Sequence, residues 1–134
     1  MNNYRQKPLK VFFDGGCRPN PGAMECAVVL RGVTDVRRSL GYGTSDEAEW
    51  LALVTAVEIA GREGVRDVIL IGDALSVIRQ ANGAERCHSD VTSIWLTRFQ
   101  VAVRQFDRVR LRHVRRTQNL AGIALERARW HEAA

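Results

Sequence analysis

The sequence predicts an α/β domain in which a five-stranded mixed sheet carries helices on both faces. Short apolar runs typical of strands recur along the chain, segments with helical periodicity lie between them, and turn residues separate the elements. At 134 residues the chain has the length of one ordinary domain, so we expect a single domain over residues 1–134.

The first strands are predicted to form an antiparallel meander. Residues 9–13 are a dense apolar run that stops at an Asp-Gly-Gly sequence, which places Asp14 at a strand end. Residues 17–22 hold two prolines, an asparagine and a glycine and are predicted to turn, so that residues 26–30 form the second strand. We expect residues 36–42 to be its hairpin partner.

The rest of the chain is predicted to alternate between helix and strand. Residues 46–60 place apolar side chains at helical spacing and end at Gly61, and residues 68–71 form an apolar run of the kind found in buried parallel strands. That run ends at Gly72, so Asp73 is a second carboxylate at a strand end. The remaining predicted elements are helix 74–81, helix 89–106, strand 109–114 and helix 119–130. This order gives an antiparallel meander followed by parallel strands that are linked through helices.

The composition is that of a folded, basic protein. Hydrophobic residues make up 46% of the chain and charged residues 26%, which excludes an intrinsically disordered chain. Lysine and arginine outnumber aspartate and glutamate by 20 to 15, and this excess favours a polyanion such as nucleic acid as the partner.

Cysteine usage and hydropathy point to the cytoplasm. Cys17, Cys26 and Cys87 form no paired motif, which argues against a zinc knuckle or a disulfide scaffold and favours reduced thiols. The N-terminal residues lack the apolar stretch of a signal peptide, and no apolar run is long enough for a membrane helix. We therefore expect a soluble, cytoplasmic protein with no membrane partner.

Several carboxylates are predicted to meet at one edge of the sheet. Asp14 and Asp73 follow two buried strands, and the acidic residues 46–49 open a helix. Taken singly, an Asp-Gly pair after a strand also fits a plain turn, and an acid at a helix start also fits a cap. Together, acids so close would repel one another, and a bound cation is the natural resolution. Mg²⁺ prefers such oxygen ligands and shares them with phosphate oxygens, as in a phosphodiesterase site.

Four segments, in order along the chain, resemble the motifs of type 1 ribonucleases H. Residues 11–22, VFFDGGCRPNPG, resemble the family's opening signature, in which the first-strand aspartate precedes glycine, a short turn and Asn-Pro-Gly. Residues 44–53 are similar to its second motif and place the catalytic glutamate at Glu49, and residues 71–75 resemble the third motif. Residues 113–119, HVRRTQN, are similar to the strand and loop of the archaeal-type branch, which lacks a basic protrusion.

The resemblance implies a ribonuclease H-like fold and a metal-dependent endonuclease that hydrolyses the RNA strand of RNA–DNA hybrids, leaving 5′-phosphate and 3′-hydroxyl ends. It implies a two-ion site for Mg²⁺ or Mn²⁺ in which Asp14 is shared and Glu49 and Asp73 bind the substrate-side ion. The intact acids favour an enzyme, because a protein that only binds nucleic acid gains nothing from mutually repelling carboxylates. Two alternatives stay open: a hybrid- or RNA-binding module that has lost catalysis, and a nuclease subunit or a domain serving a reverse transcriptase.

The chain departs from the family at the fourth active-site position. The family's last helix usually reads Asn-x-x-Ala-Asp, and here Ile123 stands where the aspartate is expected. Asn119 lies on the same helix face one turn earlier, and its amide oxygen is a neutral ligand. The expected catalytic and metal-binding set is therefore Asp14, Glu49, Asp73 and Asn119. The alternative is that Asn119 only caps the last helix. A neutral fourth ligand should weaken the binding of the second ion and favour Mn²⁺.

Substrate contacts are expected from residues near the site and from arginines. The contacts with the hybrid that follow from the resemblance are Gly15, Arg18, Asn20, Asp46 and Gln80. The arginines expected to bind phosphates, in place of the protrusion for which the chain has no room, are Arg79, Arg112, Arg115 and Arg116. Asn20 also fits a plain turn former and Arg18 a solvated charge, and His113 is expected to be a packed or edge histidine rather than a catalyst. No obligate protein partner is evident, and we expect a monomer.

Overall fold

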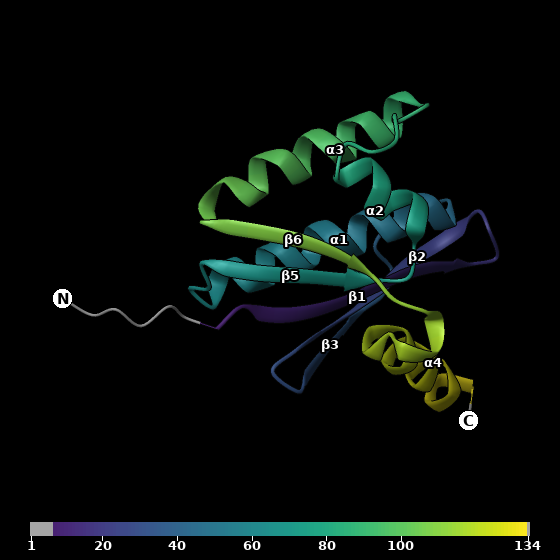
Figure 1. The fold of residues 1–134 in the computed structure, drawn as a ribbon. Helices are drawn as coiled ribbons and strands as arrows, with labels where there is room; N and C mark the ends of the chain where they lie inside the picture. The colour runs from purple at the N-terminus through teal and green to yellow at the C-terminus, as the bar shows by residue number, and fades with distance from the viewer. Residues whose placement is uncertain (1–6, 134) are drawn as a thin grey trace.

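One sheet forms the centre of the molecule. The computed structural model describes residues 7–133 and places six strands in one sheet in the order β3-β2-β1-β5-β6, with the short strand β4 paired to β2 (Figure 1). The strands are β1 (Leu9–Arg18), β2 (Gly22–Leu30), β3 (Val33–Arg37), β4 (Tyr42–Gly43), β5 (Asp67–Gly72) and β6 (Arg108–His113). The helices are α1 (Ser45–Arg62), α2 (Leu75–Ala81), α3 (Asp90–Ala102) and α4 (Leu120–Ala133), with short 3-10 turns at Val103–Gln105 and Arg116–Gln118. None of the helices within residues 7–133 combines the length and the apolar character that a membrane crossing requires.

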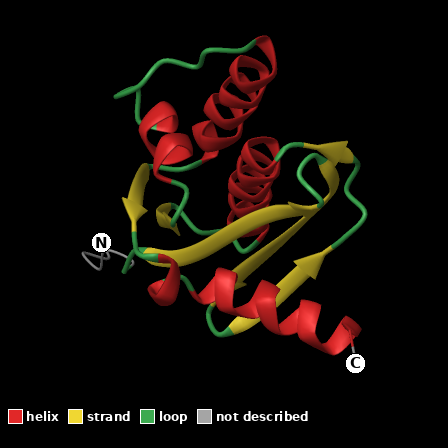
Figure 2. Cartoon of the chain, turned by 90° about the vertical axis from the view of Figure 1, so that its right-hand side faces the viewer, coloured by secondary structure: helices red, strands yellow, loops and turns green. Residues whose placement is uncertain are grey.

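The strand pairing makes the sheet mixed. β1 pairs with β2 in antiparallel and with β5 in parallel, and β6 continues the parallel half on the other side of β5. Helices α1, α2 and α3 lie on one face of the sheet and α4 lies on the other (Figures 1 and 2). The fold class predicted from the sequence is therefore confirmed, with β4 as a two-residue addition.

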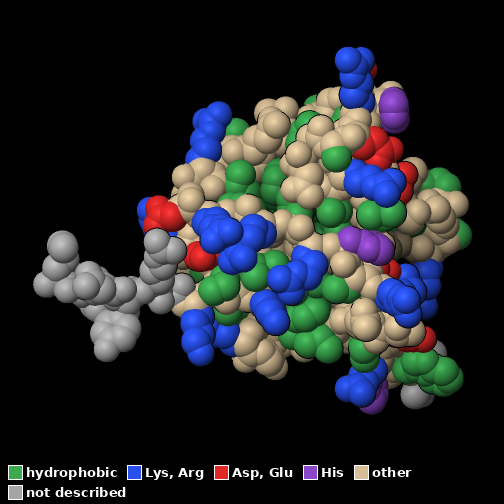
Figure 3. Space-filling view, viewed as in Figure 1, with side chains coloured by type: hydrophobic (Ala, Val, Ile, Leu, Met, Phe, Trp, Pro, Cys, Tyr) green, Lys and Arg blue, Asp and Glu red, His purple; other side chains and the backbone are tan. Residues whose placement is uncertain are grey.

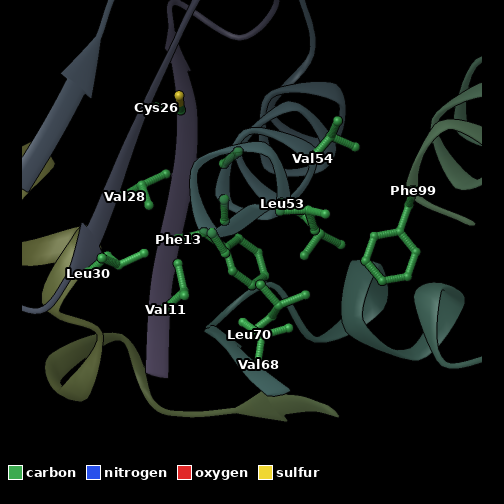
Figure 4. Packing of buried hydrophobic residues seen from close by; sticks show 14 of the residues in the cluster. Val11, Phe13, Cys26, Val28, Leu30, Leu53, Val54, Val68, Leu70 and Phe99 are labelled. Atoms are coloured by element: carbon green, nitrogen blue, oxygen red, sulfur yellow. The ribbon is translucent and has the colours of Figure 1, made fainter. Parts of the chain in front are cut away.

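The larger core lies between the sheet and α1. Phe13 from β1, Leu70 from β5 and Leu53 from α1 are fully buried there. Figure 4 shows these three side chains pointing into the same layer, with Phe99 of α3 beside it. Trp50 of α1 packs edge-on against Phe99, with 6.4 Å between the ring centroids, so α3 is fastened to α1 rather than to the sheet.

A smaller core fixes α4 against the opposite face. Ala121 and Leu125 of α4 pack with Ala27 and Val29 of β2, and all four are buried. Because the chain enters α4 directly after Asn119, this contact determines where that residue lies relative to the sheet.

Asp14 does not end its strand, contrary to the prediction. β1 continues to Arg18, since the antiparallel partner β2 pairs with it as far as Arg18 and Ala23. Residues 17 and 18, predicted to turn, are therefore strand. The parallel partner β5 stops earlier: its last pair with β1 joins Phe12 to Ile71, so Asp14 stands just past the end of that pairing.

Two other boundaries differ from the prediction. The strand predicted over residues 36–42 is divided into β3 and β4 by a bend in which Ser39 and Gly41 take positive φ values of 54° and 102°. A strand cannot continue through such backbone angles. The helix predicted over residues 89–106 ends at Ala102, and a 3-10 turn follows it.

Candidate active site

Three acids from separate parts of the chain meet beside the middle of the sheet. Asp14 lies on β1, Glu49 lies near the start of α1, and Asp73 follows β5 directly. One carboxylate oxygen from each acid lies within 4.8 Å of the other two. Asp14 is only 2% exposed, whereas the side chain of Asp73 is 14% exposed. The three acids therefore form one cluster, with Asp73 on its more accessible side.

A glycine lets α1 come close enough to β1 for this cluster to form. A Cβ atom at Gly15 would overlap the carbonyl oxygen of Ala48 on α1, so no larger residue fits without a shift of the helix. The Gly15 N–H donates a hydrogen bond of 3.0 Å to Glu49 Oε1. The sequence predicts Gly15 as a substrate contact, and the structure gives it a role in positioning Glu49.

We expect Gly15→Ala to destabilise the protein. The added methyl group would push α1 away from β1, which should cost about 2 kcal/mol of unfolding free energy, as overpacked cores do. Urea denaturation measures the loss. Gly16→Ala is the matched control, because a Cβ atom there meets the movable guanidinium of Arg129 and no backbone atom. Equal losses in the two variants would contradict the packing role of Gly15.

Burial and mutual repulsion change the ionisation of the acids. Desolvation by burial raises the pKa of Asp14 to about 6, and the charge of Asp73 adds to the rise, while a hydrogen bond with Glu49 opposes it. Desolvation and the charge of Asp14 raise the pKa of Glu49 well above its ordinary value. In the absence of a cation, burial therefore favours the protonated forms of Asp14 and Glu49.

Two oxygens of this pair have no hydrogen-bond partner among residues 7–133. They are Asp14 Oδ1 and Glu49 Oε2, and both atoms are buried. Buried acceptors without a partner are rare in proteins and call for an explanation such as a bound water or ion. Since carboxylate oxygens are the ligands that Mg²⁺ and Mn²⁺ prefer, this donor set fits a hard divalent cation.

Asn119 is fully buried beside the acids and uses both ends of its amide. The amide nitrogen donates to Asp73 Oδ1 at 2.8 Å and to the carbonyl oxygen of Phe13 at 3.0 Å. The amide oxygen accepts from the N–H of Ala121 at 3.1 Å, which caps the start of α4. The structure thus shows the capping role that the sequence left open. In this orientation the amide nitrogen faces Asp73 and the helix engages the oxygen, so the amide presents a donor to the acids. The metal-ligand role expected for Asn119 stays a prediction.

Arginine charge lies on the exposed side of the cluster. Arg116 Nη1 lies 3.7 Å from Asp73 Oδ2, and the Arg116 side chain is 67% exposed. Arg115 is exposed next to it. His113 is exposed at the end of β6, which fits an edge histidine. The acids are therefore reached from solvent past these basic side chains.

The expected substrate contacts in the β1–β2 turn lie against the start of α1. Asn20 accepts the N–H of Ser45 at 3.1 Å and donates to the Ser45 hydroxyl at 2.8 Å, so it fastens the turn to the helix. Asp46 is exposed in the first turn of α1. Arg18 is exposed, with its Nε 3.5 Å from Glu25 Oε1.

Gln80, another expected substrate contact, lies largely in the core. It is 8% exposed, and its amide oxygen accepts from the indole N–H of Trp50 at 3.2 Å. A buried tryptophan N–H requires a hydrogen-bond acceptor. The need of Trp50 for such a partner was the signal that sequence reasoning did not use. Little of Gln80 is left to contact a substrate.

Gly122 is a site residue that sequence reasoning did not single out. A Cβ atom there would lie 3.5 Å from Asp14 Oδ2 and 3.7 Å from Asn119 Cβ. The first turn of α4 therefore covers Asp14 directly. Gly122 falls at the alanine of the Asn-x-x-Ala-Asp pattern, and this small residue was the signal in the sequence that could have identified it.

The sheet is an antiparallel meander continued by two parallel strands, α4 lies on its own face, and three acids lie beside the end of β5. This arrangement defines a ribonuclease H-like fold. Comparison with known proteins agrees with this class. The model of the reverse transcriptase-like family matches residues 12–128, and the chain belongs to that family.

The chain is similar to named ribonucleases H of archaea and bacteria. It shares 33% identity with ribonuclease HI of Halobacterium salinarum, in an alignment that covers 87% of this chain but only 61% of that protein's length. The crystal structure of RNase H1 from the same archaeon has a TM-score of 0.83 at 29% identity, covering 89% of this chain and 94% of that chain.

Two more distant structures share the fold. An N-terminal RNase H domain of Mycobacterium tuberculosis has a TM-score of 0.80 at 22% identity, covering 96% and 100% of the two chains. LC11-RNase H1 in complex with an RNA/DNA hybrid has a TM-score of 0.77 at 20% identity, covering 90% and 98%.

Proposed function

We propose that the chain is a metal-dependent endonuclease that hydrolyses the RNA strand of RNA–DNA hybrids. The observation that carries the proposal is the cluster of Asp14, Glu49 and Asp73, in which buried carboxylate oxygens lack a partner among the described residues. The 33% identical relative is named ribonuclease HI, and one structural neighbour was solved with an RNA/DNA hybrid. Both names support a hybrid as the substrate. The 5′-phosphate and 3′-hydroxyl ends of the products are part of the proposal and follow from the motif resemblance.

The three acids are the proposed ligands of Mg²⁺ or Mn²⁺. When bound, such an ion activates water and stabilises negative charge on the reacting phosphate. A metal ion binds the ionised carboxylate, and burial raises the pKa of Asp14 to about 6, so metal affinity should rise with pH through about 6. Ile123 offers no oxygen, and the two-ion arrangement that the resemblance implies would therefore depend on further ligands from the substrate phosphates.

Neighbouring residues would hold the acids and the substrate in place. Asn119 fixes the direction of the Asp73 carboxylate through their hydrogen bond. Arg116 and Arg115 lie where a phosphate could approach the acids, and guanidinium groups bind phosphates well. Asn20 and Asp46 flank the first turn of α1 and are the proposed contacts with the 2′-hydroxyl groups that distinguish the RNA strand.

A second candidate function is a hybrid-binding module without catalysis. Two observations favour this candidate: Ile123 stands in place of a fourth acid, and the Asn119 amide turns its nitrogen toward Asp73. It does not explain why three costly, mutually repelling acids are kept together.

Cleavage assays separate the two candidates. The protein is incubated with a labelled RNA–DNA hybrid, an RNA duplex and a DNA duplex, each with Mg²⁺, Mn²⁺ or a chelator. We expect cleavage of the RNA strand of the hybrid alone, and none with the chelator. Tight binding of the hybrid without cleavage in any metal would support the binding module instead.

A further inference from the structure

The last strand of the sheet carries a regular series of arginines. In β6, Val109 and Leu111 pack against the larger core, so they face α1. Since successive side chains of a strand point to opposite faces, Arg108, Arg110 and Arg112 project from the face on which α4 lies. This alternation places the Cα atoms of three arginines in a row, about 6.6 Å apart.

The part of that face over β5 and β6 is lined by these basic side chains. α4 packs against β1, β2 and β3. Ile69 and Ile71 of β5 are nevertheless only 3% and 2% exposed. Arg110 and Arg112 lie next to them in the register on one side, and Lys10 lies next to Ile69 on the other. Long basic side chains cover apolar surface with their aliphatic stems and keep their charged ends in water.

The series continues to the acid cluster. His113, which ends β6, pairs with Gly72 immediately before Asp73, and the exposed Arg115 and Arg116 follow. Figure 3 looks onto this edge of the sheet and shows lysine and arginine side chains gathered across its middle. We call the continuous surface the basic track, and its members are Lys10, Arg108, Arg110, Arg112, Arg115 and Arg116.

Most of the chain's net charge is concentrated on the basic track. Asp67 lies 3.2 Å from Arg110, and Asp73 lies 3.7 Å from Arg116. Within residues 7–133 no ion pair involves Lys10, Arg108, Arg112 or Arg115. The six basic side chains of the track, less the two acids that pair with them, leave four positive charges on this surface. The net charge of the whole chain is +5.

We propose that the basic track binds the phosphate backbone of a nucleic-acid duplex and extends the substrate footprint along β6, away from the acids. From Arg108 to His113 the strand covers about 17 Å. A duplex rises about 3.4 Å per base pair, so the track matches about five base pairs beyond the reacting phosphate. This inference rests on the proposed function, because it takes the acids as the place where the same duplex is cut.

Charged side chains on an edge strand also have another use, which is to prevent pairing with the edge of a second molecule. That use predicts a change in aggregation when the charges are removed and no change in affinity for nucleic acid. The two roles are therefore separable by experiment.

The test compares two triple variants that lose the same charge. The track variant is Lys10→Gln, Arg108→Gln and Arg110→Gln, and the control is Arg62→Gln, Arg104→Gln and Arg127→Gln, which are exposed elsewhere. Fluorescence anisotropy in the presence of a chelator measures the affinity for hybrids of about 8 and about 20 base pairs. The measurement is repeated at several salt concentrations, because the slope of affinity against salt reports the number of phosphate contacts.

We expect the track variant to bind the long hybrid at least about tenfold more weakly and to lose about two to three units of its salt slope, one for each phosphate contact. Affinity for the short hybrid should change much less, and the control should resemble the wild type. Equal losses in the two triple variants, or a track variant that binds the long hybrid as the wild type does, would overturn the inference. If the track variant still cleaves the short hybrid, its active site is intact. A wild-type protein that neither binds nor cuts any hybrid would instead refute the proposed function.

Discussion

Replacing Asp14 by asparagine should reduce hybrid cleavage by about a thousandfold or more, because the substitution removes a carboxylate that we propose as a direct metal ligand. Even residues that only orient a metal ligand contribute about 10–100-fold to metal affinity or activity. Asp14 is the most buried of the three acids, and one of its oxygens has no partner within the described chain. Asparagine has nearly the same shape, so the loss should come from the chemistry of the group and not from repacking.

The same substitution should stabilise the metal-free protein at neutral and alkaline pH. Folding raises the pKa of Asp14 from 3.8 to about 6, so the native state holds the proton more tightly than the unfolded chain does. Below about pH 3 both states are protonated, and the group contributes little to stability. As the pH rises, the unfolded chain ionises first, and the free energy of unfolding falls until the pH has passed about 6. At 1.36 kcal/mol for each unit of pKa, the full loss is about 3 kcal/mol, which Asp14→Asn removes.

Urea denaturation in a chelator measures the stability of wild type and variant at about pH 3 and about pH 8, on either side of this titration. We expect the two proteins to differ little at the lower pH and the variant to be more stable at the higher one. Asp107→Asn is the matched control, since the Asp107 side chain is 69% exposed and pairs with Arg66, which is 59% exposed. A variant that still cleaves at the wild-type rate would remove Asp14 from the mechanism. A variant less stable at the higher pH would contradict the argument that burial and the charge of Asp73 raise the pKa of Asp14.

The sequence predicted the acid cluster for a partly incorrect reason. Asp73 follows its strand as expected, but Asp14 lies within β1 and comes next to Asp73 because the parallel partner β5 ends earlier than the antiparallel partner β2. The extent of strand pairing depends on both paired segments. A single apolar run in the sequence therefore does not show at which residue its pairing with each neighbouring strand ends. The motif resemblance compensated for this, since it assigned the acids without reference to strand ends.

Two features of the site depend on packing that no local pattern contains. The direction of the Asn119 amide follows from three partners. Phe13 and Asp73 come from distant parts of the chain, and Ala121 lies two residues further along, in the first turn of α4. The alternation of β6 was readable as a strand, but the basic track depends on which part of the sheet α4 covers. Gln80 shows the converse, because a polar residue expected at the substrate became the partner of a buried tryptophan.

Asn119→Ala should be strongly destabilising, because one amide meets three separate requirements. The substitution removes a hydrogen bond to a charged carboxylate, worth about 1.5–3 kcal/mol, and leaves the carbonyl oxygen of Phe13 without its side-chain donor. It also removes the α4 cap, worth about 0.5–2 kcal/mol. Since these contributions are not fully additive, we expect a loss of about 4 kcal/mol. The Asp73 carboxylate would also lose its anchor, so Mn²⁺ should bind about 10–100-fold more weakly.

Two companion variants divide this effect into its parts. Ser89→Ala removes only a helix cap, the one at the start of α3, and shows what a cap alone is worth in this protein. Asn119→Ser keeps an oxygen that can cap α4 but loses the donation to Asp73 and Phe13, so it should regain only the capping share of the stability. Urea denaturation measures the three variants, and isothermal titration with Mn²⁺ measures their metal affinity. If Asn119→Ala costs no more than Ser89→Ala and leaves Mn²⁺ affinity unchanged, Asn119 is a cap and nothing more, and the positioning of Asp73 must come from another group such as Arg116.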